Sequence, residues 1–203
     1  MSRPLVGVLA LQGDVIDHQR ALEACGAATR RVRRAEELDD LDGLVLPGGE
    51  STAIDKLARV TGLLDPLRAA LQAGLPVFGS CAGMILLADE LLDGQPGQQT
   101  FGGLDVAVRR NAFGRQTESF EADLDVAGVA GGPVHAVFIR APWVERVGPG
   151  VQVLGAVPVP GSGGERIVAV RAGVRMATSF HPEATGDRRL HTYFLEHCVA
   201  TRR

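Results

Sequence analysis

The segment Gly79-Ser80-Cys81-Ala82-Gly83 places a cysteine where an apolar run, 75–78, gives way to an apolar helical pattern, 84–92. Small residues on both sides let the backbone turn sharply from strand to helix, as in the elbows that expose a nucleophilic serine. At the start of a helix, the partial positive charge of the backbone N–H groups stabilises a thiolate. The segment therefore predicts a nucleophilic Cys81, although a free cysteine can also be a small buried core residue.

A second motif, Ser179-Phe180-His181-Pro182-Glu183, could supply the base that such a thiol needs. Pro182 excludes a helix interior, so we expect an extended or turn geometry in which His181 and Glu183 face the same way. A histidine can take the thiol proton, and a carboxylate on its other nitrogen fixes the tautomer and stabilises the imidazolium. Alone, the motif also fits a solvated turn. Four further histidines are expected to be structural or surface residues: His18, His135, His191 and His197.

A third motif is the glycine loop 46–52, Leu-Pro-Gly-Gly-Glu-Ser-Thr, between a predicted strand and a predicted helix. Such a loop can present unpaired backbone N–H groups to an oxyanion, and the candidate donors are Gly49 and Ala82, the residue after the cysteine. A phosphate-binding loop is disfavoured because neither Gly-Lys-Ser/Thr nor G-x-G-x-x-G is present. A plain turn with Ser51 and Thr52 as helix caps is the simpler alternative.

Alternating strands and helices would bring these motifs together. In the first half, strands are predicted at 6–11, 44–46 and 75–78, and helices at 15–24, 51–57, 67–72 and 84–92. In the second half, strands are predicted at 106–108, 119–124, 134–139, 151–157, 167–171 and 175–180, and a helix at 188–199. The alternation predicts a three-layer, flavodoxin-like α/β sandwich with a mostly parallel sheet and helices on both faces. Loops after parallel strands share one edge, so Cys81 and His181 can meet.

Composition limits the class of protein. The 203 residues fit one domain over 1–203, and no segment is apolar enough for a membrane span. A net charge of −3 argues against nucleic-acid binding, and the local basic cluster Arg30, Arg31, Arg33 and Arg34 is expected to be a solvated edge. Three cysteines and no signal-like segment before the first strand favour a reducing cytoplasm, with Cys25 and Cys198 structural.

In their order along the chain, the three motifs resemble the class I, or triad, glutamine amidotransferases. Four further segments narrow the resemblance to the SNO family, the glutaminase subunits of pyridoxal 5'-phosphate synthase: 9–13 (Leu-Ala-Leu-Gln-Gly), 110–116 (Arg-Asn-Ala-Phe-Gly-Arg-Gln), 119–121 (Ser-Phe-Glu) and 138–142 (Phe-Ile-Arg-Ala-Pro). The resemblance covers essentially the whole chain. There are two departures: Ala112 stands where the family pattern has serine, and 158–164 looks like a small insertion.

The resemblance implies hydrolysis of L-glutamine to glutamate and ammonia, which would pass through a tunnel to a synthase subunit in a hetero-oligomer. Cys81, His181 and Glu183 would form the triad, with no metal or cofactor. Matching family positions would place the glutamine pocket at Gly48, Gly49, Glu50 and Ser51, with Arg110, Ile139 and Arg140 near the charged end of the amino acid. Arginine suits a carboxylate because its planar fork makes paired hydrogen bonds, although either arginine could instead form a surface salt bridge.

Two other functions are compatible with the sequence. A sibling amidotransferase subunit, for example in histidine biosynthesis, would share the triad and differ in its partner. A non-enzymatic sensor of the same fold would oxidise Cys81 instead of attacking amides, but the presence of both His181 and Glu183 argues against it.

Overall fold

The structure is a computed structural model that describes residues 3–110, 119–158 and 164–202. Most of the predicted motif 110–116, including Ala112, lies outside these ranges, as does most of the expected insertion 158–164. Across the described ranges, no helix is long and apolar enough to cross a membrane.

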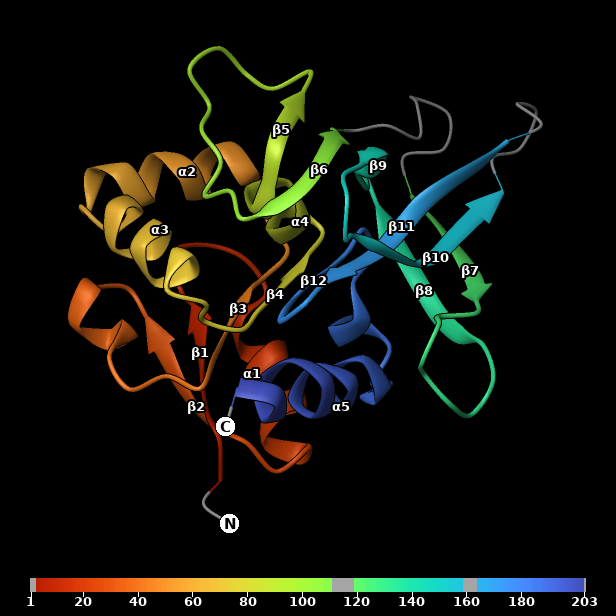
Figure 1. Ribbon diagram of the computed structural model, residues 1–203, viewed down its shortest axis with the longest axis horizontal. Helices are drawn as coiled ribbons and strands as arrows, with labels where there is room; N and C mark the ends of the chain where they lie inside the picture. Colours follow the sequence, from red (N-terminus) through yellow and green to blue (C-terminus); the bar gives the residue numbers. More distant parts are fainter. Residues whose placement is uncertain (1–2, 111–118, 159–163, 203) are drawn as a thin grey trace.

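The first half of the chain alternates strands and helices, as predicted (Figure 1). Its elements are β1 (Leu5–Leu9), α1 (Val15–Ala24), β2 (Ala28–Val32), β3 (Gly43–Leu46), α2 (Ser51–Val60), α3 (Leu64–Gln72), β4 (Val77–Ser80) and α4 (Ala82–Leu87). The strands β1, β3 and β4 are buried almost throughout. Such continuous apolar runs are typical of parallel strands that are covered on both faces.

The second half is mainly strands. Its elements are β5 (Ala88–Leu92), β6 (Leu104–Arg109), β7 (Ser119–Leu124), β8 (Val134–Ile139), β9 (Trp143–Val147), β10 (Gln152–Pro158), β11 (Glu165–Ala172), β12 (Arg175–Thr178) and α5 (Arg189–Phe194). Short helical turns occur at Ala35–Leu38, Pro182–Ala184, Leu195–Val199 and Ala200–Arg202. The predicted closing helix is therefore α5, continued by a wider π turn.

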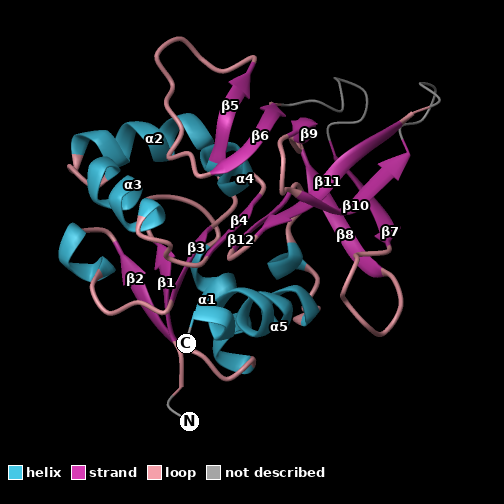
Figure 2. Ribbon diagram, viewed as in Figure 1, coloured by secondary structure: helices cyan, strands magenta, loops and turns pink. Residues whose placement is uncertain are grey.

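The main sheet has the order β2-β1-β3-β4-β12-β11-β9-β6-β5, with β10 paired to β11. Pairing is parallel from β2 to β12 and between β5 and β6, and antiparallel around β11 and β9. The strands β7 and β8 form a separate antiparallel hairpin to one side (Figure 2). The predicted α/β fold with a mostly parallel central sheet is confirmed, and the neighbours β1, β3, β4 and β12 end at one edge.

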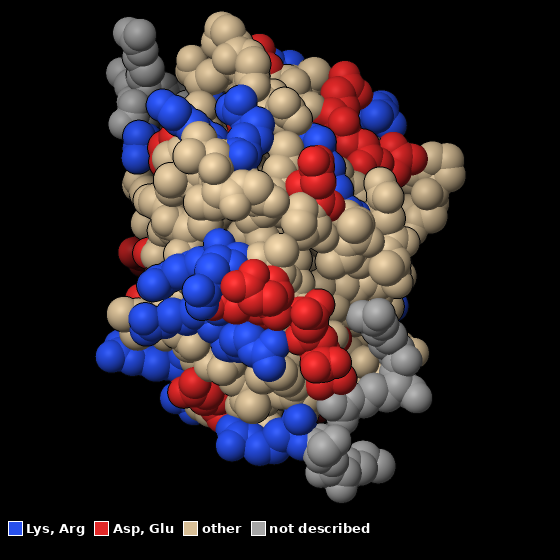
Figure 3. Space-filling view, turned by 90° about the vertical axis from the view of Figure 1, so that its left-hand side faces the viewer, with Lys and Arg blue, Asp and Glu red and all other residues tan. Residues whose placement is uncertain are grey.

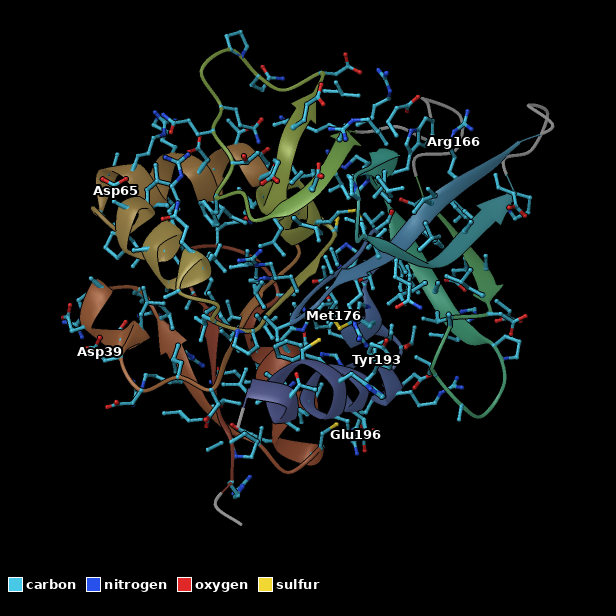
Figure 4. All side chains as sticks on the ribbon, viewed as in Figure 1. Asp39, Asp65, Arg166, Met176, Tyr193 and Glu196 are labelled. Atoms are coloured by element: carbon cyan, nitrogen blue, oxygen red, sulfur yellow. The ribbon has the colours of Figure 1, made fainter. Side chains whose placement is uncertain are left out.

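Two apolar clusters cover the two faces of the sheet. The first joins α2, α3 and α4 to one face, and the second joins α1, α5 and the β7–β8 hairpin to the other. Met176 on β12 and Tyr193 on α5 are buried together in the second cluster (Figure 4). Both faces are therefore covered, as the prediction of helices on both sides requires.

Several predicted boundaries were wrong. The helix predicted over 84–92 ends at Leu87, because Ala88 turns to extended geometry and the chain continues as β5 beside β6. The sequence did not show where the helix ends, because α4 is buried on every side and its residues are apolar without a helical period. The helix predicted over 67–72 starts at Leu64, since Pro66 lies in its first turn, where a missing N–H costs nothing.

Besides β5, two strands were not predicted. The strand β2 carries Arg30 and Arg31 within it, and β9 is a short strand over Trp143–Val147. Because β2 is the edge strand beside β1, its arginines can reach polar partners: Nη1 of Arg30 donates to the Asp39 carbonyl. On this side of the molecule basic side chains alternate with acidic ones (Figure 3), so the interpretation of the cluster as a solvated edge agrees with the structure.

Candidate functional site

Cys81 is the residue between β4 and α4 and has a left-handed backbone, φ 49°. Such a φ is strained in a non-glycine residue and typical of functional sites. The two flanking glycines permit close packing: a Cβ on Gly79 would lie 2.5 Å from the Gly83 carbonyl, and one on Gly83 would lie 2.1 Å from the Leu46 oxygen. The sharp strand-to-helix turn that the sequence predicts is therefore present.

His181 is held beside the elbow by sheet register. Thr178, the last residue of β12, pairs with Ser80, and the N–H of Cys81 donates to the Thr178 carbonyl at 2.8 Å. His181 follows three residues later, and its own N–H donates to the Val137 carbonyl of the hairpin at 3.0 Å. Two residues a hundred positions apart are thus brought together by adjacent parallel strands.

Glu183 orients the His181 ring. Its Oε1 lies 2.8 Å from Nδ1 of His181, and the Glu183 side chain is 2% exposed. Of the two geometries expected here, extended or turn, the structure shows a turn: Pro182 begins a short 3-10 turn, Pro182–Ala184, that His181 precedes. Proline fits the first position of such a turn because no hydrogen bond is required of its nitrogen.

The surroundings of His181 hold its ring in the charged form. Burial alone would lower the pKa of His181, but the hydrogen bonds and charges of Cys81 and Glu183 outweigh it and raise the pKa to about 10. Because Nδ1 is occupied by Glu183, Nε2 is the ring nitrogen left to carry a proton toward the sulfur. The imidazolium therefore persists at neutral pH.

The glycine loop follows β3, the strand beside β4. A Cβ on Gly48 would lie 2.4 Å from Cε1 of His181, so this glycine packs directly against the ring. The Gly48 carbonyl accepts from the N–H of Asp14 at 3.2 Å, and the N–H of Glu50 donates to Oε1 of Gln12 at 2.8 Å. The loop is therefore held from one side by the segment that follows β1.

Gly49 and Ala82, the two candidate oxyanion donors, lie at one cavity. Gly49 has φ 154°, a region that favours glycine, and a Cβ there would lie 2.4 Å from the Gln12 amide oxygen. Ala82 is the first residue of α4, where backbone N–H groups have no partner within the helix. Both residues line the same cavity as Cys81.

That cavity has a volume of about 160 Å³, below the range of drug-sized pockets and suited to a ligand the size of an amino acid. Its lining includes most of the residues predicted for substrate binding, namely Gly49, Glu50, Ser51, Arg110, Ile139 and Arg140. Cys81, Ala82, Ile85 and Pro142 complete the lining. Arg140 is exposed, with a left-handed φ of 44°. Gly48 lies beside the His181 ring instead.

Charged groups gather at one side of the cavity. Nη2 of Arg110 lies 3.0 Å from Oε1 of Glu50, and its Nη1 lies 2.7 Å from Oε1 of Gln98. Glu50, and neither Ser51 nor Thr52, caps α2, because its carboxylate accepts from the N–H groups of Thr52 and Ala53. These contacts hold the pKa of Glu50 below its ordinary value despite partial burial, which acts in the opposite direction.

Two buried histidines beside the triad were not predicted as part of the site. Nε2 of His18 lies 3.3 Å from Oε2 of Glu183, and its Nδ1 lies 3.0 Å from Nε2 of His191. His18 lies on α1 one turn before Leu22, another fully buried residue. A polar residue on the apolar face of a helix is the sequence signal that could have identified it. Gln12 belongs to the family segment 9–13, whereas Asp14 and Gln98 carried no comparable signal.

The other cysteines and histidines lie away from the cavity lining. Cys198 is fully buried, and burial raises the pKa of its thiol to about 11, as expected of a structural cysteine. Cys25 ends α1 and is half-buried. His135 is exposed between Glu121 and Asp123 on the hairpin.

One group in the described part of the chain has donor atoms spaced for a metal ion: Asp14, His181 and Glu183, within 4.8 Å of one another. Nδ1 of His181 already contacts both carboxylates, at 2.8 Å to Glu183 and 3.5 Å to Asp14. The hydrogen bond to Glu183 and the ion-pair contact with Asp14 account for this spacing.

Comparisons with known proteins give one consistent result. A model of the SNO glutamine amidotransferase family matches residues 8–200. A protein of Nocardia farcinica described as "Pyridoxal 5'-phosphate synthase subunit PdxT" is 66% identical over 195 residues, which cover 96% of this chain and 86% of that protein. A protein of Acidothermus cellulolyticus with the same description is 61% identical over 202 residues, or 100% of this chain and 97% of that protein.

Comparison with solved structures gives a result consistent with the family match. One described as "Crystal structure of glutamine amidotransferase" superposes with a TM-score of 0.86 at 50% identity, covering 95% of this chain and 98% of that chain. A putative GMP synthase subunit from Thermoplasma acidophilum superposes with a TM-score of 0.69 at 19% identity, covering 100% of this chain and 97% of that chain, and shows the fold alone.

Proposed function

Because this chain belongs to the SNO glutamine amidotransferase family, we propose that it hydrolyses L-glutamine to L-glutamate and ammonia with Cys81, His181 and Glu183 as a triad. The observation that carries the proposal is the strained elbow at Cys81 beside a histidine whose Nδ1 is fixed by a buried glutamate. The Cys-His-Glu geometry matches the roles of nucleophile, acid–base and orienting group.

In the first half of the reaction, the Cys81 thiolate attacks the side-chain amide carbon of glutamine. The carbonyl oxygen becomes an oxyanion, for which the N–H groups of Gly49 and Ala82 are the proposed donors. The tetrahedral intermediate collapses as the carbon–nitrogen bond breaks, and His181 gives the Nε2 proton to the leaving nitrogen. Ammonia departs and a glutamyl thioester remains on Cys81.

In the second half, neutral His181 takes a proton from water, and the resulting hydroxide attacks the thioester carbonyl. Collapse of this intermediate releases glutamate and restores the thiolate beside the imidazolium. Glu183 stabilises the charged ring at each stage through its 2.8 Å contact with Nδ1.

Glutamine would bind with its α-amino and α-carboxylate groups toward the charged side of the cavity. Arg110 and Arg140 provide positive charge for the carboxylate and Glu50 provides negative charge for the ammonium, while Gly49, Ser51 and Ile139 shape the walls. The side-chain amide would then extend toward Cys81.

The partner is proposed from the relatives, which are described as subunits of pyridoxal 5'-phosphate synthase. The ammonia would serve a synthase subunit of that complex. We place the protein in the cytoplasm because the described cysteines are all free thiols. One glutaminase domain over 1–203 is supported by the single main sheet, whose two faces carry the two cores.

The test is ammonia release from glutamine by the wild-type chain and by Cys81→Ala, each with the synthase subunit present. The variant should lose turnover and still associate with the synthase subunit, since the substitution removes one buried sulfur. Turnover retained by Cys81→Ala would refute the function. If the wild-type chain releases ammonia only in the presence of some other synthase, the proposed glutaminase reaction stands and the proposed partner is wrong.

A further inference from the structure

One oxygen of the Glu183 carboxylate is unused in the mechanism above. Oε1 accepts from His181, whereas the buried Oε2 has no hydrogen bond of ordinary geometry to any described residue. A buried carboxylate oxygen is costly to leave without a donor. The nitrogen that faces it is Nε2 of His18, at 3.3 Å.

His18 is completely enclosed at this position. Its Nε2 also lies 2.9 Å from Oγ of Ser80, the residue before the nucleophile, and its Nδ1 lies 3.0 Å from Nε2 of His191 on α5. Phe78 stands edge-on to the His18 ring, with centroids 6.2 Å apart. The ring is therefore fixed by contacts with β4, α5 and the loop after β12.

The contacts favour one arrangement of the protons. If Nδ1 of His18 donated to His191, Nε2 could accept from Oγ of Ser80 but would present a lone pair to the Glu183 carboxylate, and Nδ1–H of His191 would be a buried donor without a described partner. In the opposite arrangement, His191 donates to His18, and Nε2–H of His18 points at Ser80 and Glu183. Only a lone pair on Nδ1 of His191 is then left over, which costs less than an unpaired N–H.

Both rings are neutral. Burial lowers the pKa of His18 well below its ordinary value, and the neighbouring His191 and His181 lower it further. Burial also lowers the pKa of His191 to about 4, against a small opposing effect of Asp187. A neutral His18 adds a donor beside Glu183 without adding a charge that would compete with the His181 imidazolium.

We propose that His18 is a positioning residue for this reaction: its Nε2–H lies between Oγ of Ser80, at 2.9 Å, and Oε2 of Glu183, at 3.3 Å, and attracts the carboxylate so that Oε1 stays aimed at Nδ1 of His181. This inference rests on the proposed function. It adds a fourth residue, one that touches neither the cavity nor the substrate, and it predicts a loss confined to the chemical step.

The matched variants are His18→Asn and His18→Gln. An asparagine amide reaches only the place of Nδ1, so it keeps a contact with His191 and leaves Oε2 unpaired. A glutamine amide reaches the place of Nε2 and restores the donor. With the synthase subunit present, we expect kcat to fall about 10- to 100-fold in His18→Asn, with KM within about twofold of wild type, and to recover to within about threefold in His18→Gln.

A double-mutant cycle with Glu183→Ala separates positioning from general damage. Without the Glu183 carboxylate there is nothing for His18 to hold, so adding His18→Asn should lower kcat less than twofold further. Losses that multiply in the double variant, or equal losses in the Asn and Gln variants, would overturn the role of His18 and leave the triad intact. A wild-type kcat in Glu183→Ala would refute the catalytic role of Glu183, and with it the proposed positioning role of His18.

Discussion

Gly48 offers a direct way to displace the proposed general acid–base without removing it. Its φ lies outside the left-handed region, so alanine fits the backbone, but a Cβ would lie 2.4 Å from Cε1 and 2.8 Å from Nδ1 of His181. Carbon atoms settle at about 3.5 Å or more. The ring must therefore move by about 1 Å, and it has little room, since Nδ1 is bonded to Glu183 at 2.8 Å.

A displacement of this size at a reacting group costs about 100-fold in rate. We expect Gly48→Ala to lower kcat by about that factor, with KM for glutamine changed far less, because Gly48 lies beside His181 and not among the residues that line the cavity. The assay is ammonia release with the synthase subunit present, together with a thermal melt to show that the fold is kept. Gly164→Ala is the control, since a Cβ there meets its first neighbour at 3.5 Å.

A Gly48→Ala enzyme with wild-type kcat and an intact fold would refute the argument that His181 must stay in place. An equal loss in Gly164→Ala would show that the effect is not specific to the contact with His181.

Three further predictions follow from charges. Because the pKa of His181 is raised to about 10, its ring keeps its proton below that pH, and kcat/KM should fall as pH rises through about 10. A fall near pH 7 would contradict a charged His181 at neutral pH. Because burial lowers the pKa of both His18 and His191, the latter to about 4, the contribution of these two histidines to stability should be complete above the unfolded value of about 6.5. It should fall toward pH 4, by up to about 1.4 kcal/mol per pH unit for each histidine. Urea unfolding at several pH values measures this loss, and a flat profile would contradict burial of the neutral rings. Arg110→Met should raise KM for glutamine about 10-fold or more with kcat nearly unchanged, and an unchanged KM would remove this arginine from the binding site.

The alternation of strands and helices in the first half and the meeting of Cys81 with His181 could be predicted from sequence, because they depend on local patterns. The glycines around Cys81 and the proline after His181 are local signals of turns. The alternation of strands and helices indicates a parallel sheet. The strand β2 was missed because its arginines satisfy their charges through partners from other segments, such as the Asp39 carbonyl. Edge strands tolerate such residues, so a period-based prediction fails there.

His18 shows the second limit of sequence reasoning. Its partners come from the ends of β4 and β12 and from α5, and the contact with His191 spans 173 positions. No local pattern encodes that meeting. The helix α4 shows a third limit, since an apolar run buried on all sides gives no period by which to separate helix from strand.

The central claim is that the sulfur of Cys81 carries the glutamyl group during turnover. Rapid acid quenching of the complete complex during glutamine turnover, followed by mass spectrometry of peptides, tests it directly. We predict a single glutamyl adduct on the peptide that contains Cys81, absent in Cys81→Ala and more abundant when hydrolysis is slowed. Steady ammonia release with no adduct on that peptide, and with the same rate in Cys81→Ala, would contradict it.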